Sequence, residues 1–328
     1  MQSRRTVLII PGLGNSGPQH WQTLWEARKP EYRRIQQDDW EQPRCRDWTR
    51  NIDGAISSAD LRSCRARVLP AAQFPWRGHT IQLAGELTAA PTMTRVLGQM
   101  VEVPIGAKPN ADWYVAFGRA MKQAYKARLE GLDDANSLAA DACTTHLTVC
   151  DQEGTMVAMT TTLLSSMGSR VVLPKSGILM NNGVMWFDPR PNQPNSIAGG
   201  KRPLTNISPI ILRDGERPWF AAGASGGRRI LASVVQLMAF VTDFGMSLEE
   251  AAHYPRVDVS GPESLSADRR LAPDVIDALA SDGHTEVVEH GVMPINFACP
   301  NAIISDSDGM RTGISDAASP WSAALAQS

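Results

Sequence analysis

A short hydroxyl-rich segment, Thr144-Thr145-His146, carries the residues best suited to chemistry in this chain. A threonine hydroxyl inside a chain is a poor nucleophile because it needs a base to remove its proton. If the peptide bond before Thr144 were cleaved, the new α-amine could act as that base within the same residue. The segment therefore predicts an enzyme that cleaves its own chain and then uses Thr144 as its nucleophile.

The residues after Thr144 are typical of a β-hairpin that would position this nucleophile. Residues 145–150 and 156–162 are rich in β-formers, and the turn-forming sequence Asp-Gln-Glu-Gly separates them. Thr162 ends the second of these strands. We expect its side chain to form a hydrogen bond with the hydroxyl of Thr144.

A glycine pair, Gly226-Gly227, is the candidate oxyanion hole. It lies between a strand that ends near Gly223 and a helix that begins near Arg229. Backbone N–H groups at the N-terminus of a helix suit a developing negative charge, and glycine allows close approach of the reacting carbon.

The same glycine-rich stretch also permits a different mechanism. Residues 223–227 fit the Gly-x-Ser-x-Gly pattern, in which Ser225 would be the nucleophile of an α/β-hydrolase esterase. Acid and base candidates follow in the required order, namely Asp274 or Asp277 and His284 or His290. A third possibility is a non-catalytic remnant whose hydrolase-like N-terminus serves as an interaction surface.

Strands and helices that would position these residues are visible in the hydrophobic pattern. The expected strands are residues 6–10, 207–212 and 219–222, and the expected helices are residues 19–28, 112–129 and 230–244. The first strand, a glycine-rich loop and the first helix together predict the opening of an α/β unit.

Composition limits the classes of function. The 328 residues, 43% of them hydrophobic, are enough for two domains with a core, and 32 basic residues nearly balance 34 acidic ones. We therefore expect no electrostatic attraction to nucleic acid or membrane. Five cysteines without a C-x-x-C pair argue against a disulfide framework or a zinc site, so no cofactor or metal is expected. The short apolar run near the N-terminus does not predict a signal peptide, and we expect a cytoplasmic protein.

From residue 74 onward the chain resembles the γ-glutamyltranspeptidase and cephalosporin acylase family. The ordered segments that carry the resemblance are Thr144-Thr145-His146, Thr160-x-Thr162-Leu163, Gly168-Ser169, residues 177–182, Lys201-Arg202-Pro203-Leu204, residues 223–230 and Gly313-Ile314-Ser315-Asp316.

The resemblance implies an α+β fold, the four-layer αββα sandwich of N-terminal nucleophile hydrolases. It implies that Thr144 is the autoprocessing nucleophile, that Thr162 supports it, and that the glycine pair donates to the oxyanion. It further implies that Thr205 and Asn206 contact the substrate, and that cleavage before Thr144 yields a heterodimer of large and small subunits.

Two positions depart from the family's pattern for γ-glutamyl substrates. Trp186 occupies the place of an aspartate that holds the substrate's α-ammonium, and Leu164 replaces a polar pocket residue. An apolar pocket cannot pair with an ammonium group. We therefore expect a small-molecule amide or peptide substrate without that amine, bound with the help of Trp186 and Asn182, as in the cephalosporin acylase branch.

The first part of the chain resembles another family. Residues 5–57 resemble small α/β-hydrolases related to retinoblastoma-binding protein 9, although the nucleophile elbow of that family does not follow. We expect an α/β-hydrolase-like β-loop-α segment at 1–57, a junction at 58–73, the end of a large-subunit-like region at 74–143 and a small-subunit-like catalytic region at 144–328. Most of the large subunit has no counterpart, so the sandwich is expected to be partial. Catalysis is then expected to require another chain.

Overall fold

The structure is a computed structural model that describes residues 7–9, 27, 32–34, 65–131, 142–188, 190, 192–198, 200–292 and 296–326. Its largest element is a six-stranded antiparallel sheet with the order β13-β12-β8-β7-β4-β3. The strands are β3 (Ala72–Trp76), β4 (His79–Leu83), β7 (Ile210–Asp214), β8 (Arg217–Ser225), β12 (Cys299–Ser305) and β13 (Arg311–Ser315).

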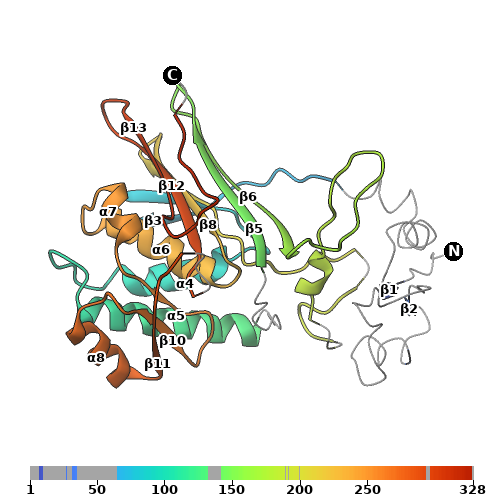
Figure 1. Ribbon diagram of the computed structural model, residues 1–328, viewed down its shortest axis with the longest axis horizontal. Coiled ribbons are helices and arrows are strands. Elements are labelled where there is room, and N and C mark those ends of the chain that lie inside the picture. The colour runs from blue at the N-terminus through green and yellow to red at the C-terminus, as the bar shows by residue number, and fades with distance from the viewer. Residues whose placement is uncertain are drawn as a thin grey trace.

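Helices cover one face of this sheet and bury the main core (Figure 1). They are α4 (Ala90–Met100), α5 (Ala111–Gly131), α6 (Arg229–Thr242), α7 (Leu248–His253) and α8 (Pro273–Asp282). The central helix α6 is buried along most of its length because apolar residues surround its axis. The helices predicted at 112–129 and 230–244 are therefore confirmed, with ends shifted by one or two residues.

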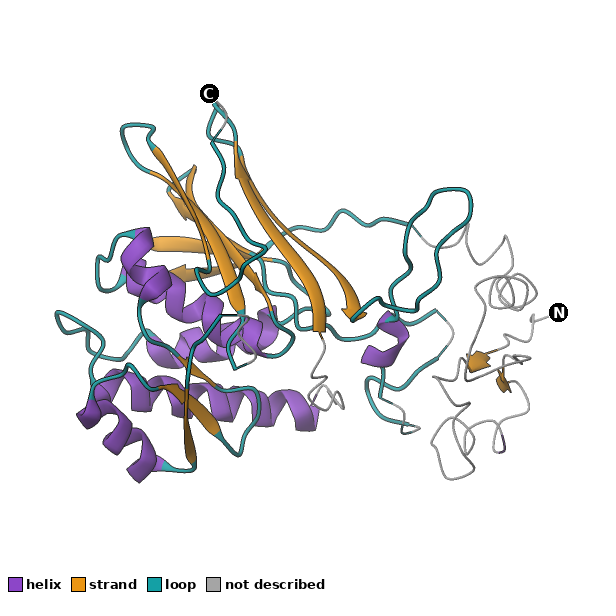
Figure 2. Ribbon diagram, viewed as in Figure 1, coloured by secondary structure: helices purple, strands orange, loops and turns teal. Residues whose placement is uncertain are grey.

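A two-stranded antiparallel sheet lies over the other face. Its strands are β5 (Ala142–Cys150) and β6 (Met156–Ser165), the hairpin predicted from the sequence. The amide of Asn301 on β12 donates to the backbone oxygen of His146 at 2.7 Å and accepts from the Thr148 hydroxyl at 3.1 Å. The described residues thus form three layers, a helical layer, the large sheet and the hairpin (Figure 2).

A small third sheet completes the helical side of the molecule. It has the order β11-β10-β9 and contains β9 (Val257–Asp258), β10 (Leu265–Asp268) and β11 (Thr285–Val288). The strand predicted at 207–212 begins at Ile210 instead. The backbone oxygen of Ile207 accepts a hydrogen bond from the backbone N–H of Ala89, outside the strand ladder.

The N-terminal segment contributes a separate strand pair. The strands β1 (Val7–Ile9) and β2 (Tyr32–Arg34) are parallel, and each pairs only with the other among the described residues. A parallel pair is what an α/β unit requires. The helix expected at 19–28 lies outside the described residues except for Ala27. No helix in the described part of the chain is both long and apolar enough to cross a membrane.

Candidate active site

The two threonines expected to act together lie side by side across the hairpin. Thr144 on β5 is the register partner of Thr162 on β6, and their hydroxyl oxygens are 3.0 Å apart. Both side chains are partly buried. The sequence alone predicted this contact, because the hairpin places directly opposed residues on the same face.

The Thr162 hydroxyl also contacts the peptide bond that would be cleaved. It donates its proton to the backbone oxygen of Cys143 at 2.9 Å, and it accepts from the backbone N–H of Leu164 at 2.9 Å. Because that single proton is committed to Cys143, the hydrogen bond between the threonines must use the proton of Thr144. Thr162 therefore polarises the carbonyl group of the Cys143–Thr144 peptide bond while it holds the Thr144 hydroxyl beside it.

An irregularity in the hairpin produces this arrangement. The register shifts between Cys143 and Thr144, so that Cys143 pairs with Leu164 and Thr144 pairs with Thr162. This leaves Leu163 as an extra residue on β6, and Leu164 adopts a φ of 71°, which is unfavourable for a side chain with a Cβ. The bulge turns the backbone of the predicted cleavage site toward the Thr162 hydroxyl.

Asn182 holds the bulged end of β6. Its side-chain oxygen accepts from the Ser165 amide at 3.1 Å, its side-chain nitrogen donates to the Ser165 hydroxyl at 2.9 Å, and its backbone N–H donates to Leu163. The side chain that we predicted to bind substrate is thus engaged with β6. Its substrate contact stays a prediction.

His146 is a packing residue close to the threonine pair. Its ring is 7% exposed, its Nδ1 lies 2.8 Å from the Thr160 hydroxyl, and its Nε2 is buried without a protein partner among the described residues. Burial lowers the pKa of His146 to about 4, so the imidazole is neutral at pH 7. The ring fills the space above Gly223 on β8, where an added Cβ would lie 2.2 Å from a ring carbon.

The glycine pair lies where β8 meets α6. Gly226 has a φ of 139° and Gly227 a φ of 62°, and a Cβ on Gly226 would lie 2.8 Å from Ala298. The side chain of the N-cap residue, Arg228, makes no capping hydrogen bond to α6. The turn therefore requires glycine, and it leaves a helix N-terminus that suits an anion. The hairpin approaches this turn because His146 touches Gly223, three residues before Gly226.

The predicted substrate residues Trp186 and Thr205 line a cavity of about 850 Å³. Trp186 belongs to a short 3₁₀ helix, η1 (Gly183–Trp186), and the rest of the lining comes mainly from residues 67–71, 82–88, 202–203 and 207–211. The lining does not include Thr144, Thr162 or the glycine pair. The cavity and the threonine pair are therefore distinct features of the described residues.

A buried arginine, which the sequence analysis did not identify, fixes the segment that contains Thr205. Arg128 on α5 is 2% exposed and donates to the Thr205 backbone oxygen and the Asn206 side-chain oxygen, each at 2.9 Å. It also donates to the Thr92 hydroxyl on α4 at 3.2 Å. The sequence held one signal for this residue, namely that Arg128 is a single arginine on the apolar face of the predicted helix.

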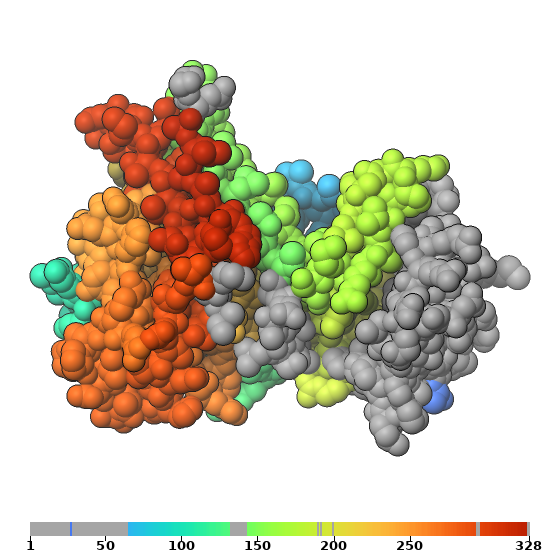
Figure 3. All heavy atoms as spheres, viewed as in Figure 1, coloured from blue at the N-terminus to red at the C-terminus, as the bar shows by residue number. Residues whose placement is uncertain are grey.

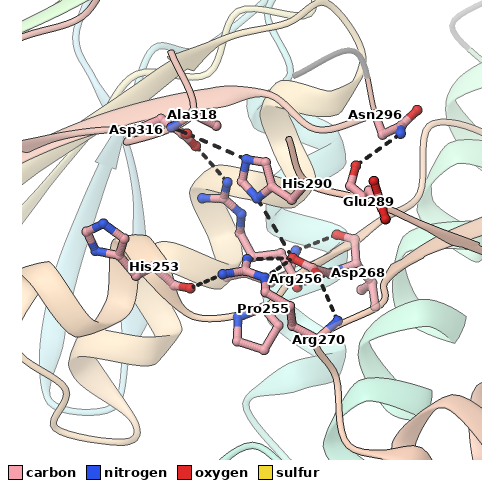
Figure 4. Close-up of polar contacts among 12 residues, drawn as sticks. His253, Pro255, Arg256, Asp268, Arg270, Glu289, His290, Asn296, Asp316 and Ala318 are labelled. Carbon is pink, nitrogen blue, oxygen red and sulfur yellow. Dashed lines mark hydrogen bonds and ion pairs between the residues drawn. The ribbon is translucent and has the colours of Figure 1, made fainter. Parts of the chain in front are cut away.

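The structure does not support the alternative mechanism, in which Ser225 would be the nucleophile of an α/β-hydrolase. Ser225 is paired with Cys299 within the antiparallel sheet, whereas the α/β-hydrolase elbow stands on a mainly parallel one. His284 is exposed. The ring of His290 contacts Asp268 and Asp316, not Asp274 or Asp277 (Figure 4).

This second cluster is a buried ion network. Arg256 pairs with Asp316 at 2.7 Å, and the pair is almost fully buried. Burial opposes ionisation of Asp316, but hydrogen bonding to His290 and the charge of Arg256 outweigh it and lower its pKa to about 2. Among the described residues, no group of three or more His, Cys, Asp or Glu side chains is arranged to hold a metal ion.

Comparison with known proteins gives the context of these features. The family model described as gamma-glutamyltranspeptidase matches residues 136–325, and a model described as serine hydrolase matches residues 7–69. The second match agrees with the resemblance of residues 5–57 to small α/β-hydrolases.

Two curated relatives of this chain differ in the activity that their names give, an acylase and a glutathione hydrolase. The chain is 37% identical over 194 residues to the Acylase ACY 1 proenzyme of Pseudomonas sp. (strain V22), covering 59% of this chain and 33% of that protein. It is 31% identical over 174 residues to the glutathione hydrolase proenzyme of Bacillus subtilis (strain 168), covering 53% and 29%. The chain thus spans about a third of the length of the curated relatives it matches.

A solved structure supports the fold. The cephalosporin acylase from Bacillus halodurans matches with a TM-score of 0.71 and 22% identity, covering 81% of this chain and 54% of that chain. At this identity the likeness shows the fold, and it confirms the predicted N-terminal nucleophile hydrolase architecture. With the family model matching more than half of its residues, the chain belongs to the gamma-glutamyltranspeptidase family.

Proposed function

We propose that this protein is an amide hydrolase or acyltransferase that matures by cleavage of the Cys143–Thr144 peptide bond. The observation that carries the proposal is the position of the Thr162 hydroxyl, 3.0 Å from the Thr144 hydroxyl oxygen and 2.9 Å from the Cys143 backbone oxygen. One side chain thereby aligns the attacking group and activates the carbonyl group that it would attack.

In the cleavage step, the Thr144 hydroxyl oxygen attacks the carbonyl carbon of Cys143. The C–N bond then breaks, the hydroxyl proton moves to the departing nitrogen, and an ester joins Cys143 to Thr144. Water hydrolyses this ester, which leaves a carboxylate on Cys143 and a free α-amine and hydroxyl on Thr144. Thr162 holds the reacting groups in place during both steps.

In the catalytic cycle, the new α-amine takes the proton of the Thr144 hydroxyl as the oxygen attacks the amide carbonyl of a substrate. The N–H groups of Gly226 and Gly227 stabilise the oxyanion, and the proton passes to the departing amine. The resulting acyl-threonine ester is released by water or by an acceptor amine.

The proposed substrate is an amide whose acyl group lacks a free α-ammonium. The proposal rests on the types of two residues: Trp186, in place of the family's aspartate, lines a cavity whose lining does not include Thr144, and the 8% exposed Leu164 is an apolar residue at the bulge. Neither residue has a carboxylate that could form an ion pair with an α-ammonium group, although the chain also resembles glutathione hydrolases. The similarity to Acylase ACY 1 supports this choice.

Mass spectrometry of the purified protein tests the cleavage proposal. We expect a fragment that begins at Thr144 and a second fragment that ends at Cys143. Thr144→Ala should remain uncut, whereas Thr144→Ser should be cleaved because it keeps the hydroxyl. Recovery of only the uncut wild-type chain, under conditions in which it is folded, would support the non-catalytic alternative instead.

Competing substrates test the choice of acyl group. Processed enzyme should hydrolyse a glutaryl amide faster than the matching γ-glutamyl amide, which differs only by the α-ammonium. Trp186→Asp should shift the ratio of the two kcat/KM values toward the γ-glutamyl amide by roughly tenfold or more, because it supplies a carboxylate. An unchanged ratio would show that Trp186 does not determine which acyl group the enzyme prefers.

A further inference from the structure

The proposed chemistry is divided between two layers of the molecule. The groups that carry out cleavage, the Thr144 and Thr162 hydroxyls and the Cys143 carbonyl group, all belong to the β5–β6 hairpin. The proposed acyl transfer also needs the N–H groups of Gly226 and Gly227, which follow β8 of the large sheet. Acyl transfer therefore depends on how the hairpin is placed over the sheet, whereas cleavage does not.

A histidine of the hairpin lies directly on the backbone of β8. A Cβ added to Gly223 would lie 2.2 Å from Cε1, 2.4 Å from Nε2 and 2.5 Å from Nδ1 of His146. Because the three distances are nearly equal, the added atom would meet the face of the ring and not its edge. The ring and the glycine therefore form a stack between the two layers, with no side chain between them.

Contacts with both layers hold the ring of His146 in this position. Its Nδ1 lies 2.8 Å from the hydroxyl of Thr160, the residue directly opposite on β6. The backbone oxygen of His146 accepts from the Asn301 amide at 2.7 Å, and Asn301 is the register partner of Gly223 in the large sheet. The ring and the backbone of His146 are thus held at the same place on the sheet, and the buried ring cannot swing into solvent.

Both ends of this stack lie close in the chain to the reacting groups. His146 is two residues after Thr144 on β5, so that both side chains point to the inward face, and Gly223 is three residues before Gly226. Among the described residues, the hairpin pairs with no strand of the large sheet, and it lies at the surface beside the C-terminal strands (Figure 3). Its height above the sheet is therefore set by side-chain contacts such as this stack.

We propose that His146 is a positioning residue for acyl transfer, because its ring is the spacer that sets the distance between Thr144 and the glycine pair. This role rests on the proposed function, and it involves no bond making or breaking by His146. A methyl group on Gly223 would have to displace the ring by about 1 Å to reach an ordinary contact distance. A displacement of about 1 Å can lower a rate roughly a hundredfold, because oxyanion donors act over a narrow range of distance.

The test measures two rates in the full chain carrying Gly223→Ala. The rate of appearance of the Thr144 N-terminus, followed by mass spectrometry, should stay within about threefold of wild type, because every group needed for cleavage lies in the hairpin. The kcat of the processed variant for a glutaryl amide should fall roughly a hundredfold, with KM changed by less than about threefold. A residue that only stabilises the fold would not separate these two rates.

A second substitution and a matched control complete the test. Asparagine at position 146 lacks Cε1 and Nε2, the two ring atoms nearest to the added Cβ. His146→Asn with Gly223→Ala should therefore have a kcat at least about tenfold above that of Gly223→Ala alone. Gly118→Ala is the control, because a Cβ there would lie 2.9 Å from Leu265 in the helical layer, away from both reacting groups. It should leave kcat within about twofold at a temperature where every variant is folded.

His146→Asn alone gives the same comparison if Gly223→Ala does not fold. The shorter side chain removes the spacer from the other layer, so kcat should fall at least about tenfold while cleavage stays within about threefold of wild type.

Three results, each obtained with an active wild-type protein, would overturn the positioning role of His146. They are a full kcat in folded Gly223→Ala, cleavage that is slowed as much as acyl transfer, and a double variant no faster than Gly223→Ala alone. All three leave the proposed function standing. A folded wild-type protein without acyl transfer activity would contradict the proposed function, and the positioning role with it.

Discussion

At the scale of single residues, the Thr162 hydroxyl has one proton and three neighbours. It donates to the Cys143 carbonyl group and accepts from Thr144 and from the Leu164 N–H, which uses its hydrogen-bonding capacity. A residue with the same shape but no hydroxyl should preserve the hairpin and lose the alignment.

We predict that Thr162→Val slows cleavage before Thr144 by roughly a hundredfold, in the range found for loss of one oxyanion donor. The measurement is the rate of appearance of the Thr144 N-terminus by mass spectrometry. Thr161→Val is the matched control, because Thr161 points outward on the same strand. Equal rates for the two variants would remove Thr162 from the mechanism.

The buried ring of His146 leads us to predict how the free energy of unfolding depends on pH. Its pKa is about 4 in the folded protein and about 6.5 in an unfolded chain, so the unfolded state binds more protons between these values. The contribution of the neutral ring is complete above pH 6.5 and is lost as the pH falls toward 4. The loss is on the order of 3 kcal/mol.

Denaturant titrations from pH 7 to pH 4 check this prediction. The stability difference between wild type and His146→Asn should shrink as the pH falls. The comparison with a variant is needed because burial raises the pKa of Asp258 to about 6, which gives the opposite slope in the same range. A constant difference for His146→Asn would contradict the neutral buried ring.

At the scale of elements, the Arg256–Asp316 pair joins the end of β13 to the segment between α7 and β9. His290 lies 3.5 Å from Asp316 and 3.8 Å from Asp268, which itself pairs with Arg270 (Figure 4). The network ties the small sheet to the edge of the large one. Removing one member leaves a buried charge without compensation.

We predict that Asp316→Asn lowers the free energy of unfolding by roughly 3–5 kcal/mol, the cost of breaking a buried pair. Replacing both partners, Arg256→Met with Asp316→Leu, should recover most of this loss because no charge remains buried. Asp308→Asn, at an exposed aspartate, should change stability by less than about 0.5 kcal/mol. Urea unfolding measures all three, and a neutral Asp316→Asn would show that the network is unimportant for stability.

At the scale of the whole molecule, one large sheet joins β3 to β13, and the buried core draws its residues from 76–125 and 210–302. The earliest strand of that sheet is β3, and the buried cluster contains no residue before Trp76 among those described. The boundaries at 58–73 and 143/144 stay predictions. The first of these can be examined through stability.

We predict that deleting residues 1–58 leaves the main thermal transition within a few degrees of the full chain, because that transition reports the core. Differential scanning calorimetry of both proteins is the measurement. A fall in the main transition by more than about 8 °C, the effect of roughly 2–4 kcal/mol in a domain of this size, would show that the N-terminal segment is part of the core.

Local pattern was sufficient for several features. The hairpin, the apolar helix α6 and the glycine turn follow from alternation, hydrophobic periodicity and glycine spacing. The opposition of Thr144 and Thr162 follows from hairpin register. In contrast, β3, β4 and the C-terminal strands were not predicted, because their short sequences acquire a strand conformation by pairing within a sheet. The rival Asp and His candidates for Ser225 were wrong, because order along the chain does not fix which histidine meets which carboxylate.

The sequence by itself determined the family, because the family's motifs are local and ordered, and it predicted which residues would carry the chemistry. Only the tertiary structure decided how they are used. The bulge at Leu163 turns the Cys143 carbonyl group toward Thr162, Arg128 fixes the segment at Thr205, and His146 fills the space over Gly223. These contacts join residues distant in the chain, so their geometry depends on packing between elements, which periodicity and spacing do not specify.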